Sequence, residues 1–214
     1  MNCCNQCQGI ENLFDRRFAQ RDLADYRRKG PSKQTRLLLN VLREVGVKGR
    51  TLLDIGGGIG AIQHELMKSG LDASLDVDAS SAYLAAAQEE AAHQGYADRA
   101  QYLHGNFIDL APQIEGADIV TLDRVICCFP DMQAMVSLSA ARAKHFYALV
   151  YPRDSWWTRL GGRAGNALLA LQRSKFRFFV HPAPQVDSLI RAEGLQPRFH
   201  GYAGLIWQVV VYAR

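Results

Sequence analysis

The stretch Leu52–Ile62, LLDIGGGIGAI, decides the fold of this chain. The apolar residues 51–55 are typical of a short buried strand, and the glycines at positions 56, 57, 58 and 60 predict a tight turn into a helix. Glycines are needed in such a turn because a ligand approaches the backbone there, and a Cβ would obstruct it. The stretch therefore predicts a strand, a ligand-binding turn and a helix in succession.

Around this stretch, short apolar runs alternate with helical patterns. Further strands are expected at 73–77, 101–104, 117–122 and 145–151, with helices at 61–69 and 80–94 and between the later strands. Such alternation is typical of parallel βαβ units in a sheet that helices cover on both faces. After a helix at 184–193, strand-like runs at 196–201 and 206–212 are too close for a parallel crossover and predict an antiparallel hairpin. We expect a Rossmann-like, doubly wound, mostly parallel seven-stranded α/β sheet with a reversed strand near its C-terminal end.

The N-terminal region predicts a helical cap. Helical spacing of apolar residues covers 10–28, Gly30-Pro31 breaks the pattern, and Ser32 can cap a second helix that runs to about Val45. We divide the chain into a cap over 1–36 and a main domain over 37–214, in which an insertion at 152–182 covers the substrate. The first helix is expected to close over the bound cofactor, with Tyr26 as a contact.

Composition and charge exclude several classes of protein. The 214 residues are 48% hydrophobic and 21% charged, which argues against disorder, and no apolar run reaches the length of a membrane span. No secretory signal is visible, so a cytoplasmic location is expected. Eight Lys or Arg against three Asp over 15–36 could attract nucleic acid or simply form a solvated helix near a site. Because no RNA-binding module is recognisable, we expect a small-molecule substrate; the oligomeric state stays open.

Five cysteines occur in two clusters, Cys3, Cys4 and Cys7, then Cys127 and Cys128. Their odd number, without an export signal, argues against a disulfide framework. A C-C-x-x-C run can bind metal, but it lacks a fourth local ligand unless Cys127 or Cys128 supplies one. We therefore predict no metal site and leave the role of the first cluster open.

Asp78 is expected to close the second strand, 22 residues after Gly56. A carboxylate at that place can accept both ribose hydroxyls of an adenosine. Gly56, Gly58 and Ala61 also satisfy G-x-G-x-x-A, the dinucleotide fingerprint, so an NAD(P)-dependent oxidoreductase is one alternative.

Three features argue against a dinucleotide. Asp54, just before the glycines, can pair with a ligand ammonium. Asn106, in GNFIDL, can bond the exocyclic amine of an adenine. The reversed C-terminal strand does not belong to the six-stranded dinucleotide fold.

From Leu37 to Arg214 the chain resembles the class I S-adenosylmethionine-dependent methyltransferases, through D-x-G-x-G-x-G at 54–60 and the acidic end of the second strand. The resemblance implies S-adenosylmethionine as cofactor and S-adenosylhomocysteine as product. It further implies that the glycines approach the methionine and ribose portions, that Asp78 takes the ribose hydroxyls, and that the neighbouring positions contact the rest of the cofactor. Those positions are Gly56, Gly57 and Gly58 in the turn, Ala79, Asn106 (where the family usually has Asp) and Phe107 around the adenine, and Asp123 and Arg124 beneath the methionine end.

Methyl transfer is a displacement on a sulfonium carbon, so a base is needed only when the accepting atom carries a proton. The family often places histidines after the fourth strand, but here the segment reads DRVICCFPD, with Cys127 and Cys128 at those positions. Asp123 or His181 could serve as the base instead, or no base is needed.

The acceptor is expected to meet the insertion, where we predict contacts from Tyr151, Arg153 and Trp156. Residues 153–177 hold six Lys or Arg against Asp154, and arginines with aromatics suit a flat, acidic organic acceptor methylated at oxygen or carbon. The YPR segment at 151–153, the late insertion and the arrangement of the whole domain loosely resemble those of magnesium-protoporphyrin O-methyltransferases and quinone-biosynthesis C-methyltransferases. A non-catalytic module that binds S-adenosylmethionine or S-adenosylhomocysteine remains the other alternative.

Overall fold

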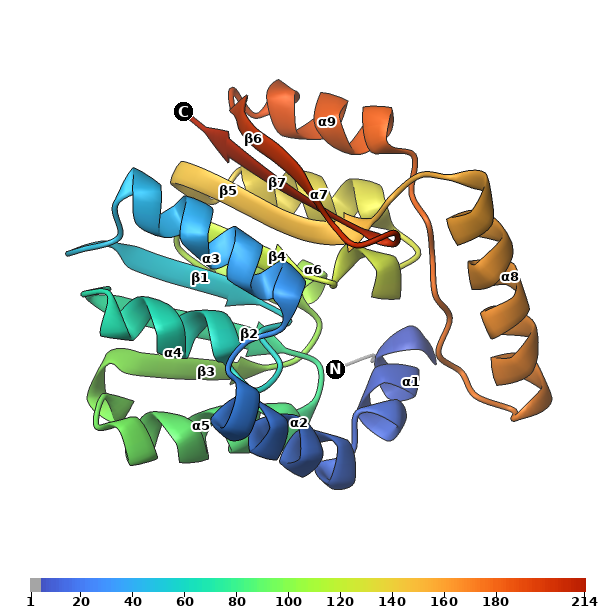
Figure 1. The fold of residues 1–214 in the computed structure, drawn as a ribbon, viewed down its shortest axis with the longest axis horizontal. Coiled ribbons are helices and arrows are strands. Elements are labelled where there is room, and N and C mark those ends of the chain that lie inside the picture. The colour runs from blue at the N-terminus through green and yellow to red at the C-terminus, as the bar shows by residue number, and fades with distance from the viewer. Residues whose placement is uncertain (1–4) are drawn as a thin grey trace.

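The computed structural model describes residues 5–214 and shows one seven-stranded sheet (Figure 1). The strands lie in the order β3-β2-β1-β4-β5-β7-β6, and all are parallel except β7, which runs antiparallel to both β5 and β6. The predicted sheet is thereby confirmed, including its reversed strand. The strand bounds are β1 Thr51–Ile55, β2 Ala73–Asp78, β3 Ala100–His104, β4 Ala117–Asp123, β5 Ala143–Pro152, β6 Gln196–Ala203 and β7 Trp207–Ala213.

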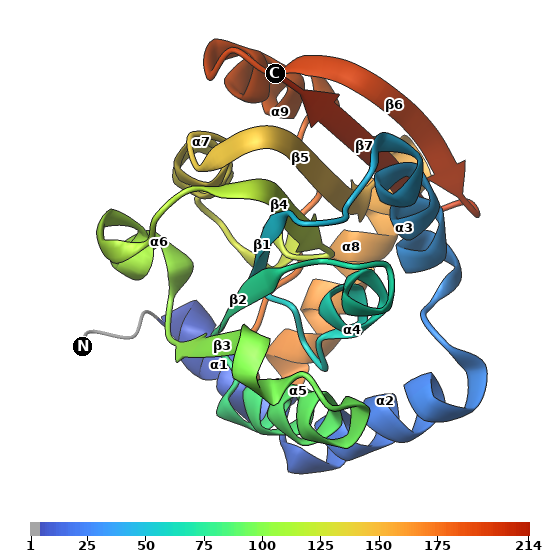
Figure 2. The same cartoon turned by 90° about the vertical axis from the view of Figure 1, so that its left-hand side faces the viewer.

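Helices cover both faces of the sheet (Figures 1 and 2). One face carries α3 (Lys33–Val45), α4 (Ala61–Lys68) and α5 (Ser81–Gln94), and the other carries α6 (Phe107–Leu110), α7 (Met132–Ala140) and α9 (Ala183–Ala192). Three short 3-10 helices lie between them, η1 Ala97–Arg99, η2 Ala111–Gln113 and η3 Ile126–Cys128. Because both faces are covered, apolar residues of the central strands are buried on both faces of the sheet. Ile119 and Val120 of β4, for example, are completely buried on opposite faces.

The N-terminal cap differs from the prediction in one respect. The expected single helix over 10–28 is divided into α1 (Asn5–Leu13) and α2 (Arg16–Lys29). The cause is Asp15, whose side chain accepts from the backbone N–H groups of Arg17 and Phe18 and so starts a new helix. The predicted cap of the next helix is confirmed, since Ser32 accepts from the N–H of Thr35. The boundary proposed at residue 36 falls within α3.

The insertion at 152–182 consists of α8 (Trp156–Leu171) and an extended return over 172–182. Figure 1 shows α8 at one end of the molecule, outside the return segment, which runs past α1. The backbones pack closely there: a Cβ on Gly9 of α1 would lie 2.5 Å from the backbone nitrogen of Phe176. None of the helices among residues 5–214 is long and apolar enough to cross a membrane.

Candidate functional site

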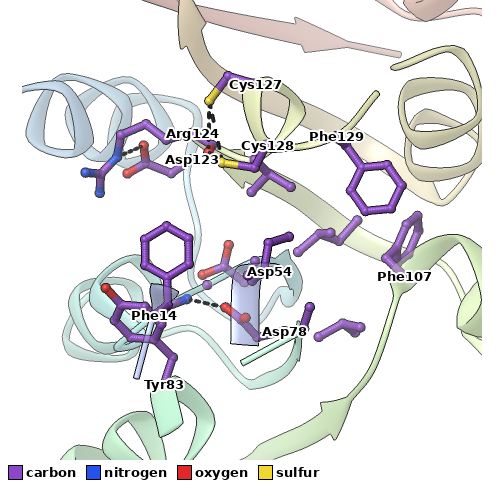
Figure 3. Close-up of a pocket in the computed structure, with 18 of the residues that line it drawn as sticks. Phe14, Asp54, Asp78, Tyr83, Phe107, Asp123, Arg124, Cys127, Cys128 and Phe129 are labelled. Carbon is purple, nitrogen blue, oxygen red and sulfur yellow. Dashed lines mark hydrogen bonds and ion pairs between the residues drawn. The ribbon is translucent and has the colours of Figure 1, made fainter. Parts of the chain in front are cut away.

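A cavity of about 390 Å³ opens at the carboxyl ends of β1, β2 and β4 (Figure 3). This position lies at the junction of the paired strands β1 and β4. From this junction, successive strands along the chain are added in opposite directions, and open α/β sheets bind ligands at such a switch point. Segments far apart in the sequence meet around it. They include the glycine turn, the ends of β2 and β4, the α1–α2 connection, the η3 turn and the return segment 172–182.

Two carboxylates of β2 accept hydrogen bonds from the backbone of the glycine turn and so stabilise it. Asp76 accepts from the N–H of Gly57 at 3.2 Å, and Asp78 accepts from the N–H of Gly58 at 2.9 Å. A Cβ on Gly57 would lie 2.7 Å from both carboxylate oxygens of Asp76, so the turn has no room for a side chain there. Gly56 and Gly58 have φ values of 63° and 60°, a region that favours glycine. The role of Asp76 as an acceptor for the backbone of this turn was not predicted from the sequence.

Asp54 lines the cavity and has a buried carboxylate oxygen without a hydrogen-bond donor among the described residues. Its Oδ1 accepts from the hydroxyl of Thr121 at 2.7 Å, while its buried Oδ2 has no hydrogen-bond donor among the described residues. Burial raises the pKa of Asp54 to about 7, and the Asp123 and Asp78 carboxylates add to the rise. A buried acceptor without a donor is costly. The α-ammonium of S-adenosylmethionine is the kind of group that would relieve this cost, so the residues present fit the cofactor.

This carboxyl predicts how cofactor affinity depends on pH. An ammonium near Asp54 stabilises its ionised form and lowers its pKa, so binding below pH 7 requires loss of a proton. The affinity for S-adenosylhomocysteine is expected to rise from pH 5.5 to 7 by a factor that approaches tenfold per pH unit, and to level off above pH 7. Calorimetric titration over this range measures it. The Asp54→Asn variant serves as the control, and its affinity for S-adenosylhomocysteine should not change with pH over this range. If its affinity rises as steeply as that of the wild type, a group other than Asp54 releases the proton.

The expected adenosine contacts lie on the cavity wall, with one change of role. Asp78, Ala79, Asn106 and Phe107 all line the cavity. However, the side chain of Asn106 caps α6: its oxygen accepts from the N–H of Ile108 at 3.2 Å, and its nitrogen donates to Asp109 at 3.1 Å. Asn106 therefore bonds its own helix in this state, and Phe107 offers the apolar surface beside it.

At the end of β4, Asp123 and Arg124 also line the cavity. Both oxygens of Asp123 are engaged, since Oδ2 accepts from the hydroxyl of Thr35 at 2.5 Å and Oδ1 from Nε of Arg124 at 3.0 Å. Arg124 has a φ of 64°, which is rare for a residue other than glycine and occurs most often at functional sites. The Asp123 carboxylate raises the pKa of Arg124. Among the described lining residues Arg124 is the one cation.

Tyr26, predicted as a cofactor contact, does not line the cavity. It is buried on α2, and its hydroxyl donates to Glu65 of α4 at 3.0 Å. The cap instead reaches the cavity through Phe14 and Asp22, and Asp22 accepts from the hydroxyl of Tyr83 at 2.6 Å. The predicted contact therefore lies one helical turn beyond Asp22, the residue of α2 that lines the cavity.

His181, predicted as a candidate base, lies behind the cavity wall rather than on it. Its Nε2 lies 2.8 Å from the carbonyl oxygen of Ile126 and 3.0 Å from that of Phe129, so this nitrogen is the donor of both bonds. Burial lowers the pKa of His181. The geometry therefore fits a residue that holds the η3 turn in place, and it corrects the assignment of His181 as base.

The three residues predicted to contact the acceptor also lie elsewhere. Tyr151 is buried in the sheet, Arg153 stacks on the ring of Tyr202 at 4.1 Å, and the side chain of Trp156 is 71% exposed. Trp156 lies on α8, which Figure 1 shows at one end of the molecule. The return segment supplies Phe176 and Phe178 in its place.

The part of the cavity wall beyond the glycine turn is formed by aromatic rings and thiols. None of these residues was predicted from the sequence as a substrate contact. Cys127 and Cys128 lie here with their sulfurs 3.9 Å apart (Figure 3), and the aromatic residues Phe129, Phe176, Phe178 and Trp207 complete this part of the wall. Alternation of Phe and basic residues in KFRFF, 175–179, could have indicated an extended segment with one apolar face. Cys3 and Cys4 lie outside the described residues.

Comparison with known proteins agrees with this geometry. A family model described as a methyltransferase domain matches residues 47–149, which include the glycine turn, Asp78 and Asp123. The matched segment covers just under half of the chain. The cofactor of this family is S-adenosylmethionine, and the oxidoreductase alternative is set aside. No curated protein sequence matches the chain significantly.

Solved structures share the fold of this chain at low sequence identity. Magnesium protoporphyrin IX methyltransferase (ChlM) from Synechocystis PCC 6803 with bound S-adenosylhomocysteine is 15% identical, with a TM-score of 0.72 over 96% of this chain and 98% of that one. An O-methyltransferase family protein from Burkholderia thailandensis is 18% identical, with a TM-score of 0.72 over 96% and 62%. A chain in the complex of the Haloferax volcanii Trm112 methyltransferase activator with a putative methyltransferase is 14% identical, with a TM-score of 0.71 over 95% and 96%.

Proposed function

We propose that the methyltransferase transfers a methyl group to oxygen or carbon of a small aromatic acceptor that carries an acidic group. The observation that carries this proposal is the composition of the cavity beyond the glycine turn. Four aromatic side chains and two thiols line this part of the cavity, and Arg124 is the one cation among the described lining residues. Aromatic walls favour a flat ring by stacking, and a guanidinium pairs with a carboxylate or phenolate.

The same wall supports an acceptor that requires little help from a base. Among the described lining residues there is no histidine or lysine, and Asp123 already accepts hydrogen bonds with both oxygens. An acidic phenol, an acidic enol or a carboxylic acid loses its proton at or below neutral pH without a strong base. Beside Arg124, its anionic form would be stabilised further.

The chain's own contribution is then to orient the reactants and exclude water. Bound S-adenosylmethionine supplies the methyl group, and the residues fit it as described: Asp54 toward the ammonium, Asp78 toward the ribose and Phe107 toward the adenine. The α1–α2 cap and the return segment close the cavity from two sides with Phe14 and Phe176, whose rings contact edge to face at 5.9 Å between centroids. Such closure keeps the acceptor aligned with the methyl group and water out.

Replacement of Arg124 by Gln tests the proposal. Loss of one charge-assisted interaction should raise the Michaelis constant for an acidic aromatic acceptor about 10- to 100-fold. The acceptors are to be taken from a panel of phenolic and carboxylic compounds, with steady-state kinetics as the measurement. The dissociation constant for S-adenosylhomocysteine should stay within about threefold of wild type.

Arg153→Ala is the matched control and should leave the kinetics unchanged, since Arg153 stacks on Tyr202 away from the cavity. If Arg124→Gln weakens S-adenosylhomocysteine as strongly as the acceptor, Arg124 belongs to the cofactor site. A preference of the wild type for cationic amines would contradict the proposal directly.

A further inference from the structure

The exposed surface of α8 is apolar to an unusual extent. Of its sixteen residues, all of which the structure describes, Thr158 alone is buried. At 100° per residue, one side of the helix carries only apolar side chains, among which Trp156 is 71% exposed and Leu171 82% exposed. We call this side the outer face of α8. Its large members are Trp156, Trp157, Leu160, Leu168 and Leu171.

The opposite side of α8 is the one that contacts the protein. Gly162 packs against Phe178, so that a Cβ there would lie 3.2 Å from the ring, and the side chain of Asn166 bonds both backbone groups of Phe178. Since Phe178 lines the cavity, α8 is fixed to the cavity wall through its inner side. Its polarity is thus inverted relative to an ordinary surface helix, whose apolar side faces the core.

The neighbouring β6–β7 hairpin extends the same apolar surface. The guanidinium of Arg153 lies 5.8 Å from the ring of Trp157 and 4.1 Å from that of Tyr202, which joins the start of α8 to the hairpin. At the tip of the hairpin, Leu205 is 77% exposed and Ile206 48% exposed. Contiguous exposed apolar surface of this kind marks an interaction site.

Basic side chains border the outer face along one edge and at its end. Arg159 and Arg163 lie on the same edge of the helix, and Arg173 and Lys175 follow its C-terminal end, all of them exposed. Over 153–177 six basic residues stand against the single acid Asp154, which is paired with Arg159. A tryptophan- and leucine-rich face bordered by arginines suits the interface of an anionic lipid bilayer, where the apolar side chains enter the acyl boundary and the arginines meet the headgroups.

We propose that the outer face of α8, together with the tip of the β6–β7 hairpin, docks this methyltransferase on the surface of anionic membranes. The docked helix lies in the plane of the interface and does not cross the bilayer. Its inner side contacts Phe178 of the cavity wall, so the cavity is held close to the membrane. This inference depends on the exposed surface alone and stands whether or not the acceptor assigned above is correct.

Vesicle co-sedimentation tests it, with vesicles of phosphatidylcholine alone and of phosphatidylcholine mixed with phosphatidylglycerol. The full chain is expected to bind the anionic vesicles, with a blue shift of tryptophan fluorescence, and to bind more weakly at high salt. A Leu160→Glu, Leu168→Glu double variant should lose at least tenfold in affinity. The matched control is Phe18→Glu, which makes the same kind of change at a 43% exposed position on α2 and should bind like wild type.

Both sets of variants change exposed positions, and unaltered binding of S-adenosylhomocysteine will show that they are folded. Failure of the wild type to bind anionic vesicles would overturn the proposal. A second outcome would also overturn it: light scattering shows that the wild type is a dimer which binds no vesicles, and that the double variant is a monomer. The outer face would then join two copies of the chain. Equal binding by wild type and double variant would also exclude α8 as the docking surface.

Discussion

In the Asp78→Ala variant, the dissociation constant for S-adenosylhomocysteine is expected to rise at least tenfold and up to about a thousandfold. Asp78 already accepts from the N–H groups of Gly58 and Ser80, at 2.9 and 2.8 Å. A carboxylate has about four acceptor positions, so two remain for the ribose hydroxyls. The variant loses those bonds together with the support of the glycine turn. Isothermal titration calorimetry measures the effect.

Asp72→Ala provides the control for Asp78, because Asp72 is an exposed carboxylate at the other end of the same strand. It should bind S-adenosylhomocysteine with wild-type affinity. If the folded Asp78→Ala variant also binds S-adenosylhomocysteine with unchanged affinity, another residue holds the ribose. The proposed position of the cofactor in the cavity would then be wrong.

Replacement of Gly57 by Ala should destabilise the protein and remove most of its cofactor affinity. The new Cβ would lie 2.7 Å from both carboxylate oxygens of Asp76, which is completely buried and has no space to withdraw. Overpacking of this kind costs about 1–3 kcal/mol, or a lowering of the melting temperature by about 2–12 °C for a chain of this length. Thermal unfolding measures the first effect, and titration with S-adenosylhomocysteine the second.

The steric origin of the Gly57 effect can be isolated with a double variant. In an Asp76→Ala background, Gly57→Ala should cost much less, because the carboxylate that it meets is gone. Gly161→Ala, on the exposed α8 with open space around it, should not lower the melting temperature at all. An equal cost of Gly57→Ala in both backgrounds would mean that the turn excludes side chains for another reason.

The sheet could be predicted from the sequence because its signals are local. The central strands β1, β2 and β4 each contain a short apolar run that leads to a glycine or an aspartate, and the short connection before β7 permits only a hairpin. The break between α1 and α2 was not predicted, because no glycine or proline marks it in the sequence. Asp15 alone caps the second helix there. Apolar spacing continues across that break.

The cavity wall that we propose for the cofactor is set by local signals, because the glycine turn follows β1 while Asp78 and Asp123 end β2 and β4, strands whose carboxyl ends share one edge of the sheet. The acceptor end could not be predicted, because it depends on how the insertion folds back. Local charge and aromatic content suggested Arg153 and Trp156, whereas Trp156 is exposed on α8 and the return segment brings Phe176 and Phe178 to the wall. Likewise, Tyr26 and Asp22 lie four residues apart on one helix, and only tertiary contacts show which of them meets the cavity.

The most direct test of the account is incubation of the enzyme with S-adenosylmethionine that carries an isotope-labelled methyl group, together with a small-molecule extract, followed by mass spectrometry. We expect a labelled methyl group on a small, acidic, aromatic product, formed by the wild type and absent with the Asp78→Ala variant. Binding of S-adenosylhomocysteine without any labelled small molecule would indicate a binding module that does not catalyse transfer. Label on a cationic amine, or on no aromatic compound, would contradict the assignment of the acceptor end of the cavity.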